Sequence, residues 1–224
     1  LANTAGSISL IDNFPRNDAH LTKNLKKAGF IIIGKANLSE WANFRGEKSV
    51  SGWSSYGGQT KNPYNHEYSP CGSSSGSAAA VALGLVPVSI GTETNGSITC
   101  PASINGVVGI KPTYSRVSRF GLIAYASSFD QIGPIANNVY DAALVLEVIS
   151  GHDSNDSTSS KKIVPPYSKL NSSSEKMKIA YMSECIDHQG LDKKIKEKFL
   201  KKVNDLQNNG HIVESVSFPY LDYL

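Results

Sequence analysis

Apolar and polar positions follow one another along the chain in patterns that predict helices and strands in turn. A helix is expected over residues 18–28, because three apolar residues share one face and Gly29 follows as a stop. The unbroken apolar run at residues 30–33 predicts a strand that is buried on both faces. A helix that leads directly into a buried strand is typical of an α/β fold.

The same patterns continue further along the chain. A stretch rich in alanine, from about Ser75 to Leu85, predicts a helix that lies deep in the structure, since small side chains let backbones approach closely. Apolar stripes predict helices at residues 137–150, with Asn137 or Asn138 as the N-cap, and at residues 191–209. Short apolar or alternating runs predict strands at residues 86–90, 107–110, 177–182 and 211–218.

Two long stretches have no helical or strand period. Residues 34–70 spread aromatic side chains among Gly, Ser and Asn, and a loop of this length is usually functional when it is ordered. Residues 152–174 are polar and contain proline, which predicts a surface loop.

Composition narrows the class of protein. The chain has 224 residues, of which 40% are hydrophobic and 18% charged, which is enough for one sizeable core and excludes a disordered protein. The net charge of +3 is too small to indicate binding to nucleic acid or to an anionic membrane. No apolar run reaches the ~18 residues of a membrane-spanning helix.

The number of cysteines and the first residues of the chain indicate the cellular compartment in which the protein is expected. The chain has three cysteines, Cys71, Cys100 and Cys185, and their odd number and the absence of a CxxC pair argue against a disulfide framework or a zinc site. We therefore expect small buried thiols in a reducing compartment, and a cytoplasmic protein. The chain begins at Leu1, and its first ten residues have no basic or long apolar region of a signal peptide.

Candidate chemistry is concentrated in two blocks rich in Gly and Ser, residues 71–77 and 92–99. A phosphate-binding loop would need a Gly-Lys-Ser/Thr sequence, and the first block has no lysine at that place. A second hypothesis is a nucleophile elbow with Ser74 as nucleophile, but turn-like residues rather than a strand precede it. The histidines available to such a triad, His152, His188 and His211, lie in or beside polar segments.

A third hypothesis uses both blocks together. A serine hydroxyl is a weak nucleophile and needs a nearby base. Where no histidine serves, a neutral lysine can take that role, with a second serine relaying the proton. The small residues of the second block could also present backbone N–H groups to an oxyanion.

The sequence resembles the amidase signature family in several stretches that occur in order. They are GKANLSEWANFRG, GGQTKNPY, PCGSSSGSAAAVA and GTETNGSITCPASINGVVGIKPT. The resemblance implies an α/β fold in which a mixed, twisted β-sheet lies between α-helices. It also implies that residues 1–224 form one amidase domain that is incomplete at both ends.

The resemblance assigns roles to particular residues. It implies that Ser97 is the nucleophile and that Ser73, 24 residues earlier and held by a cis peptide, relays a proton to a lysine. It implies an oxyanion hole made by the backbone N–H groups of Thr94, Asn95, Gly96 and Ser97. No metal and no organic cofactor is implied.

The family's catalytic lysine belongs to a Lys-Asp-Asn motif a few residues before the segment that matches Thr4–Ser7, so we expect it to lie outside this chain. Lys35 follows an expected core strand, and we interpret it as structural. The chain also stops before the part of the family that helps to bind substrate. We therefore expect a fragment that is inactive by itself.

The two halves of the chain resemble two different kinds of protein within the family. Residues 34–112 resemble free-standing amidases that act on small carboxamides, whereas residues 113–224 resemble the A subunit of glutamyl-tRNA(Gln) amidotransferase. The second resemblance rests on YSRVSRFGLIAYASSFDQIGPI, SGHDSNDSTSS and SVSFPYLDYL. It implies ammonia release from glutamine, partner subunits and, through them, tRNA. The sequence leaves open whether the join near Thr113 is natural.

Overall fold

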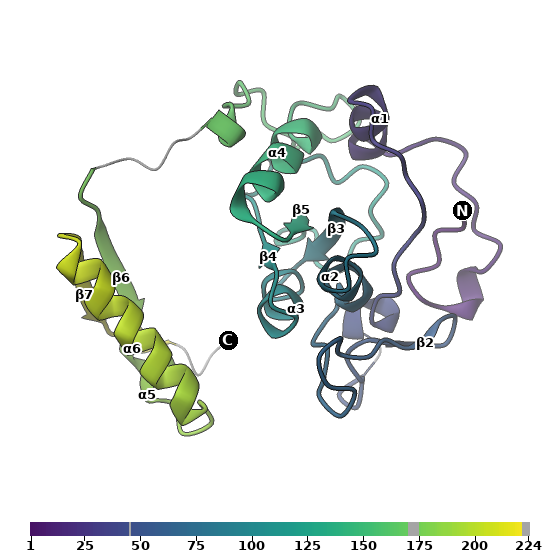
Figure 1. Cartoon of the computed structure of the whole chain (residues 1–224). Coiled ribbons are helices and arrows are strands. Elements are labelled where there is room, and N and C mark those ends of the chain that lie inside the picture. Colours follow the sequence, from purple (N-terminus) through teal and green to yellow (C-terminus); the bar gives the residue numbers. More distant parts are fainter. Residues whose placement is uncertain (45, 170–174, 221–224) are drawn as a thin grey trace. The chain divides into compact units, whose positions relative to one another are not determined.

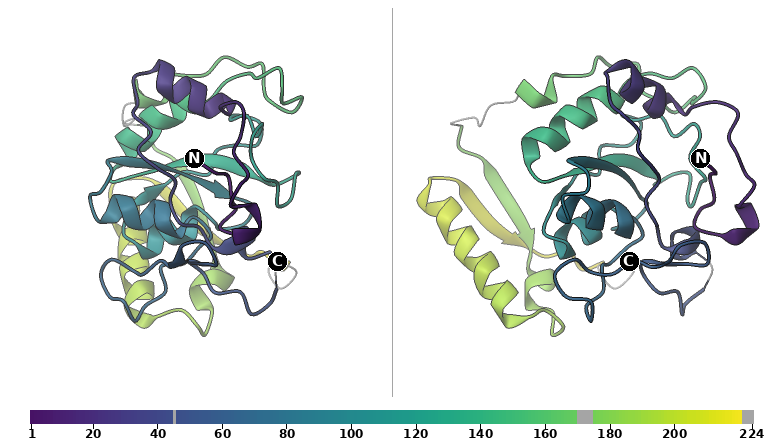
Figure 2. Two further views of the ribbon diagram at one scale, coloured as in Figure 1. Left: turned by 90° about the vertical axis from the view of Figure 1, so that its right-hand side faces the viewer. Right: turned by 45° about the vertical axis from the view of Figure 1, so that its right-hand side comes forward.

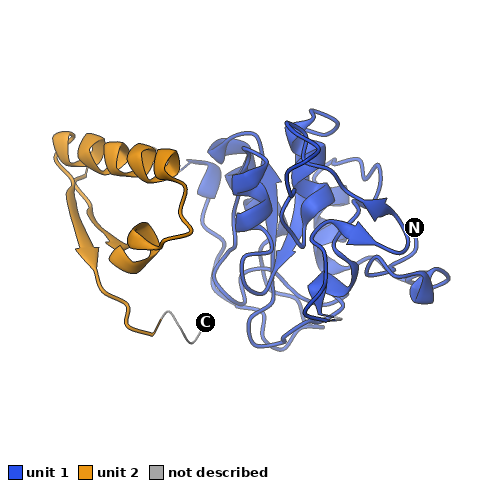
Figure 3. Ribbon diagram, turned by 90° about the horizontal axis from the view of Figure 1, so that it is seen from below, with its two compact units in different colours: residues 1–170 blue, residues 171–224 orange. Residues whose placement is uncertain are grey.

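The computed structural model describes residues 1–44, 46–169 and 175–220. The chain divides into two compact units, Leu1–Leu170 and Asn171–Leu224, shown in different colours in Figure 3. Each unit is described by itself. The expectation that residues 1–224 make up one incomplete domain stays a prediction.

The first unit is built on a three-stranded antiparallel sheet with the order β3-β5-β4 (Figure 1). Its strands are β3 (Val88–Glu93), β4 (Val108–Gly109) and β5 (Gln131–Ala136). All six residues of the central strand β5 are buried. The register runs from Val88 opposite Ala136 to Glu93 opposite Gln131, so the end of β3 lies beside the start of β5.

Helices lie on both faces of this sheet. The helices α2 (Ser75–Ala82) and α3 (Thr99–Ile104) lie on one side, and α4 (Val139–Ile149) lies on the other (Figures 1 and 2). Side chains of a strand alternate between faces, and accordingly Ile132 and Ile135 enter different cores. The expected α/β fold with a sheet between helices is confirmed.

Each core has a simple composition. The core on the α4 side also receives Leu25 from α1 (His20–Lys27), which packs against α4. In the core on the α2 side, the small Ala78 and Val81 of α2 pack against Ile98 and Ile135. The buried members of the two cores are, respectively, Leu25, Val117, Ile132, Val145, Leu146 and Ile149, and Ala78, Val81, Ile98 and Ile135.

Short elements make up the rest of the unit. There are three 3₁₀ helices: η1 (Ile8–Leu10), η2 (Glu40–Asn43) and η3 (Tyr167–Lys169). Two short strands, β1 (Trp53–Ser54) and β2 (Gly58–Gln59), pair in the antiparallel direction. Between Asn37 and Pro70 the chain is ordered by side-chain bonds rather than by long elements. The Asn37 side chain, for example, donates to the Gly58 carbonyl at 3.0 Å and accepts from the Ser54 hydroxyl at 2.6 Å.

The second unit pairs two parallel strands, β6 (Lys178–Met182) and β7 (Ile212–Val216). The helices α5 (Ser183–Asp187) and α6 (Lys193–Asn208) form the connection between them. Asp192 caps α6 by accepting from the backbone N–H groups of Lys194 and Ile195. The strands and the long helix expected here are confirmed.

The apolar run 30–33 does not form the strand that its sequence predicts. Within the part of the chain that the structure describes, no strand pairs with it, and Ile31 and Ile33 are 86% and 72% exposed. Backbone pairing and cover on both faces are what make an apolar run a buried strand, and neither is present here. The hypothesis of a core strand at this place is therefore wrong for the described residues.

In the described ranges, no helix has both the length and the apolar character that a bilayer crossing requires.

The polar loop after α4 is organised by two buried carboxylates. Asp153 accepts from the Ser118 hydroxyl at 2.6 Å, and Asp156 accepts from the Arg119 backbone N–H at 2.8 Å. Burial alone would raise the pKa of Asp153, but hydrogen bonds from Ser118 and Asn155 outweigh it and lower that pKa. The pKa of Asp156 is likewise lowered, because bonds from Arg119 and Thr158 outweigh the effect of burial.

These pKa shifts predict acid sensitivity of the first unit. A carboxyl group whose pKa is lower in the folded state stabilises the fold above its unfolded pKa of about 3.9, and this contribution is lost as the pH falls through the folded value. We expect Asp153→Asn and Asp156→Asn each to lower the free energy of unfolding at pH 7 by about 1–2 kcal/mol. Both variants should also lose less stability than the parent chain between pH 5 and pH 2, measured by urea unfolding followed by circular dichroism.

Asp12→Asn is the matched control, because Asp12 is exposed and its substitution should leave the free energy of unfolding unchanged. Equal pH dependence of the two loop variants and the parent chain would contradict the role assigned to Asp153 and Asp156.

Candidate active site

The fold brings the two Gly/Ser blocks into direct contact. The backbone N–H of Ser74 donates to the carbonyl of Ser97 at 3.1 Å, which places Ser73 beside the second block. The Gly72–Ser73 peptide is cis, as the family resemblance implies. Ser73 is 1% exposed, and its carbonyl accepts from the backbone N–H of Ser39 at 2.9 Å.

Three serines of the first block have structural hydroxyl groups. The Ser74 hydroxyl donates to the Thr92 carbonyl and accepts from the Thr92 N–H, both at 3.0 Å. The Ser75 hydroxyl donates to the Cys71 carbonyl at 2.5 Å, and that of Ser77 donates to the Ile90 carbonyl at 2.8 Å. These bonds fix the start of α2 against β3.

The hydroxyl groups of Ser73 and Ser97 differ from these. Neither one makes a hydrogen bond to another group among the residues that the structure describes. The nucleophile-elbow hypothesis, which needs a free Ser74 hydroxyl after a strand, is wrong: this hydroxyl is engaged, and no strand lies between Gln59 and Ser74. Its candidate bases have other contacts: His152 contacts the Ser159 hydroxyl at 3.0 Å, and His188 and His211 accept from the backbone N–H groups of Gly190 and Met177, both at 3.1 Å.

The segment Thr94–Ser97 forms a tight loop at the end of β3. Gly96 has a φ of +84°, which a residue without a side chain adopts at little cost. Among the described residues, none of the four backbone N–H groups of this loop donates to a protein acceptor. These are the N–H groups from which the sequence predicts an oxyanion hole.

Glu93 fixes the far side of the loop, a role that the sequence pattern did not reveal. Its buried carboxylate accepts from the backbone N–H groups of Ile98 and Thr99 at 2.7 and 2.8 Å and from the Thr99 hydroxyl at 3.1 Å. A carboxylate that accepts these donors also stabilises the start of α3. Ser97 is therefore held between β3 and α3. The signal available in the sequence was an acidic residue inside the second Gly/Ser block, shortly after an apolar run.

A disulfide joins the first block to the residue that follows the second block, which corrects the expectation of buried free thiols. Cys71 is bonded to Cys100 with their Cα atoms 6.0 Å apart, and Cys185 is free and exposed. Asn105 reinforces this link by donating to the carbonyls of Pro70 and Pro101 at 2.8 and 2.7 Å. The cysteine count could not reveal the pairing, because contact between two residues 29 positions apart depends on the fold.

This disulfide predicts a large stability difference between oxidised and reduced protein. Closing a loop of 29 residues restricts the unfolded chain and contributes about 3.6 kcal/mol in the chain-entropy model. We expect the double variant Cys71→Ser, Cys100→Ser to lose about that much free energy of unfolding, measured by denaturant titration. Dithiothreitol should destabilise the parent chain to the same extent and leave the double variant unchanged.

Cys185→Ser serves as the control, since an exposed free thiol should contribute little. If reduction leaves the unfolding midpoint of the parent chain where it was, the contribution assigned to the disulfide is refuted.

Lys35 is bonded to the first residues of the chain, although the residue is exposed. Its ammonium group donates to the Ala2 carbonyl at 2.9 Å and to the Asn3 side-chain oxygen at 3.4 Å. Burial lowers the pKa of Lys35, because removal from water disfavours the charged form. These contacts give Lys35 a structural role in joining residues 2–3 to the segment after α1.

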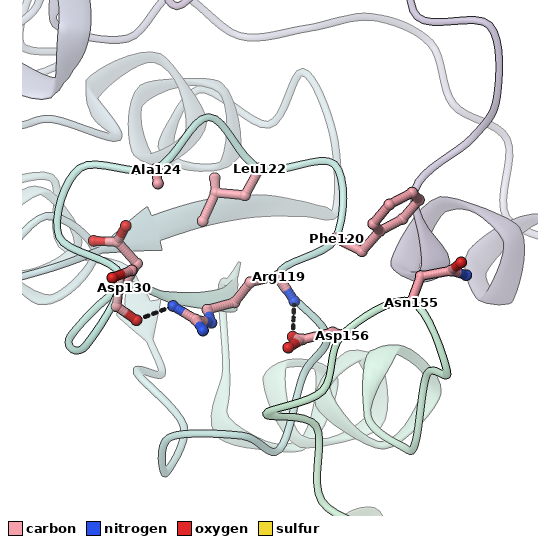
Figure 4. A pocket seen from close by; sticks show the side chains of 8 residues that line it. Arg119, Phe120, Leu122, Ala124, Asp130, Asn155 and Asp156 are labelled. Atoms are coloured by element: carbon pink, nitrogen blue, oxygen red, sulfur yellow. Dashed lines mark hydrogen bonds between the residues drawn. The ribbon is translucent and has the colours of Figure 1, made fainter.

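A cavity of about 240 Å³ lies in the same unit (Figure 4). In this view Asp130 and Asp156 lie on either side of Arg119. The Arg119 guanidinium donates to the Ser127 carbonyl and, at 3.1 Å, to the Thr158 hydroxyl. The cavity is lined by Arg119, Phe120, Leu122, Ala124, Ser127, Asp130, Asn155 and Asp156.

Solved structures and curated relatives that are similar to this chain include two kinds, peptide amidases and amidotransferase A subunits. The native peptide amidase of Stenotrophomonas maltophilia has a TM-score of 0.91 and 44% identity, and the match covers 100% of this chain and 46% of that one. The A subunit of the glutamyl-tRNA(Gln) amidotransferase of Thermotoga maritima has a TM-score of 0.89 and 42% identity, over 100% of this chain and 48% of that one. The corresponding A subunit of Prochlorococcus marinus strain NATL2A is 49% identical over 218 residues, 96% of this chain and 44% of its own length.

Fold and comparisons together place the chain among proteins with the fold of the amidases. The amidase family profile matches residues 1–224, and the chain belongs to this family. It spans somewhat less than half the length of the curated relatives it matches. Both kinds of relative match across both halves, so the division near Thr113 does not separate two sources of similarity.

Proposed function

We propose that the complete gene product hydrolyses amide bonds with Ser97 as the nucleophile. The observation that carries this proposal is the pairing of Ser73 and Ser97. They come from two blocks in backbone contact, and their hydroxyl groups have no structural partner among the described residues. The unengaged N–H groups of the Thr94–Ser97 loop add to it, because an oxyanion needs donors that are already oriented.

In this mechanism Ser73 relays a proton from Ser97 to a neutral lysine, as the family resemblance implies. Ser97 Oγ attacks the amide carbonyl, and the tetrahedral oxyanion is bound by the N–H groups of Thr94, Asn95, Gly96 and Ser97. The proton returns to the leaving nitrogen as the C–N bond breaks, which releases ammonia or an amine. Water then cleaves the acyl-enzyme, and the chemistry calls for no metal or organic cofactor.

The substrate class we propose first is a small carboxamide. Similarity to a peptide amidase at 44% identity supports it, as do the stretches from residue 34 to residue 112. The second candidate is glutamine, with ammonia passed to partner subunits that in turn bind tRNA. Similarity to several amidotransferase A subunits at 46–49% identity favours this alternative. A cytoplasmic location belongs to both proposals. The cysteines do not support it, because Cys71 and Cys100 form a disulfide and disulfides are rare in cytosolic proteins.

Ammonia release from the complete gene product tests these proposals. A simple carboxamide, an amidated peptide and glutamine are each supplied, with and without amidotransferase partner subunits. Turnover of the first two without partners supports a free-standing amidase. Glutamine hydrolysis that requires the partners supports the amidotransferase alternative. Absence of ammonia from all substrates under both conditions would refute amide hydrolysis.

A further inference from the structure

Asp130 lies where the sheet register brings two distant segments together. Glu93 and Gln131 are paired at the end of the β3–β5 ladder, so the next residues outward, Thr94 and Asp130, face each other. Asp130 ends the turn before β5 and is 3% exposed. The first residue of the proposed oxyanion loop therefore lies next to a buried carboxylate.

The hydrogen bonds of Asp130 run in two directions. One carboxylate oxygen accepts from the Thr94 hydroxyl at 2.5 Å. The carboxylate also accepts from the backbone N–H groups of Tyr125 at 2.8 Å and Ala126 at 3.1 Å. These donors are neutral, and bonds between a neutral donor and an ionised acceptor are stronger than bonds between two neutral groups.

The bond to Thr94 holds the first residue of the oxyanion loop, whereas the Glu93 carboxylate holds the residues after its last one. A loop fixed at both ends presents its N–H groups in one arrangement, and oriented donors stabilise a developing charge without reorganising. Asp130 itself also lines the cavity that contains Arg119 (Figure 4).

We propose that Asp130 is a positioning residue that acts through Thr94 to fix the oxyanion loop and ties this loop to the wall of the neighbouring cavity. The inference rests on the proposed function for its kinetic consequence, but its structural consequence is independent of activity. Loss of the Asp130–Thr94 bond should loosen the loop whether or not the protein turns over an amide.

Hydrogen exchange tests the structural part in the complete gene product. Peptide-resolved exchange should be at least about tenfold faster at the N–H groups of residues 98–100, which are bonded to Glu93 and to the Gly96 carbonyl, in Asp130→Asn and in Thr94→Val. Thr94→Val removes the bond, and Asp130→Asn replaces its carboxylate acceptor by a neutral amide. Asp156→Asn is the matched control: it alters a carboxylate in the same cavity that has no bond to the loop, so exchange there should not change. Unchanged exchange in both test variants would overturn the proposal.

Kinetics test the positioning role. Per active site, Asp130→Asn and Thr94→Val should each lower kcat by about 10- to 100-fold with KM within about twofold, while Asp156→Asn keeps kcat. The double variant should be no slower than the slower single variant, because both changes act on the same bond. If the reduction of kcat in the double variant is the product of the two single reductions, the proposal that Asp130 acts through Thr94 is overturned. If Asp130→Asn does not fold, Thr94→Val is compared with Thr94→Ser, which keeps the hydroxyl group. A higher kcat in the serine variant supports the role of the hydroxyl bond. Equal kcat in the two variants overturns it.

The two proposals fail in different ways. If Ser97→Ala retains full turnover, the nucleophile assignment fails, and the exchange result still decides the role of Asp130. If Ser97→Ala is inactive and Asp130→Asn retains full kcat, only the inference about Asp130 fails.

Discussion

Replacement of Ser97 by alanine is expected to lower amide turnover of the complete gene product by about 10⁴-fold or more, because it removes the atom that attacks the carbonyl. The rest of the site should remain, since the Ser97 contact to the first block uses its backbone carbonyl. Folding should therefore be preserved, with an unfolding free energy within about 0.5 kcal/mol of the parent. The measurement is the initial rate of ammonia release, together with mass spectrometry of the acyl-enzyme.

Ser103→Ala is the matched control, since Ser103 lies on the adjacent helix α3 with its side chain exposed. It should keep both turnover and acyl-enzyme formation. Normal turnover in the Ser97 variant would show that another residue is the nucleophile.

The second large effect is expected at Ser73. Its replacement by alanine should lower kcat by about 10²- to 10⁴-fold, the range that general acid–base catalysis contributes. The nucleophile would remain but would lose the group that passes its proton onward. Stability should change little, because the Ser73 hydroxyl has no structural partner among the described residues, in contrast to those of Ser74, Ser75 and Ser77.

Ser77→Ala provides the opposite pattern for comparison. It removes the bond to the Ile90 carbonyl and should cost about 1 kcal/mol of stability without a large change in kcat. The proton relay is refuted if kcat of Ser73→Ala stays within a few fold of the parent. Measuring kcat against pH in both variants separates loss of a proton acceptor from loss of folded enzyme.

Four helices, α1, α2, α4 and α6, could be predicted from the sequence because their signals are local; α3 and α5 were not predicted. The capping residue Asn138, the stripe of α6 and the alanine-rich run of α2 act within a few turns of chain. The Gly/Ser blocks also stood out locally, and the resemblance to the family singled out Ser73 and Ser97. Their catalytic roles stay predictions until the variants above are measured.

The central strand β5 shows why the sheet could not be read in the same way. Its sequence, QIGPIA, contains a Gly-Pro pair that usually marks a turn, and proline cannot donate to a ladder. The strand forms because β3 and β4 pair with its two sides, with Pro134 opposite Ile90. The run at 30–33 is the reverse case, a good strand sequence without a paired neighbour among the described residues.

The sequence alone thus determined four helices, α1, α2, α4 and α6, and the two serine-rich blocks, since each depends on residues close together in the chain. The tertiary structure alone decided which serine hydroxyls are engaged, that Cys71 meets Cys100, and that Glu93 and Asp130 hold the two ends of the Thr94–Ser97 loop. The physical reason is sequence distance: these contacts join residues up to 36 positions apart, and only the packing of α2, α3 and β5 around β3 brings them within bonding range.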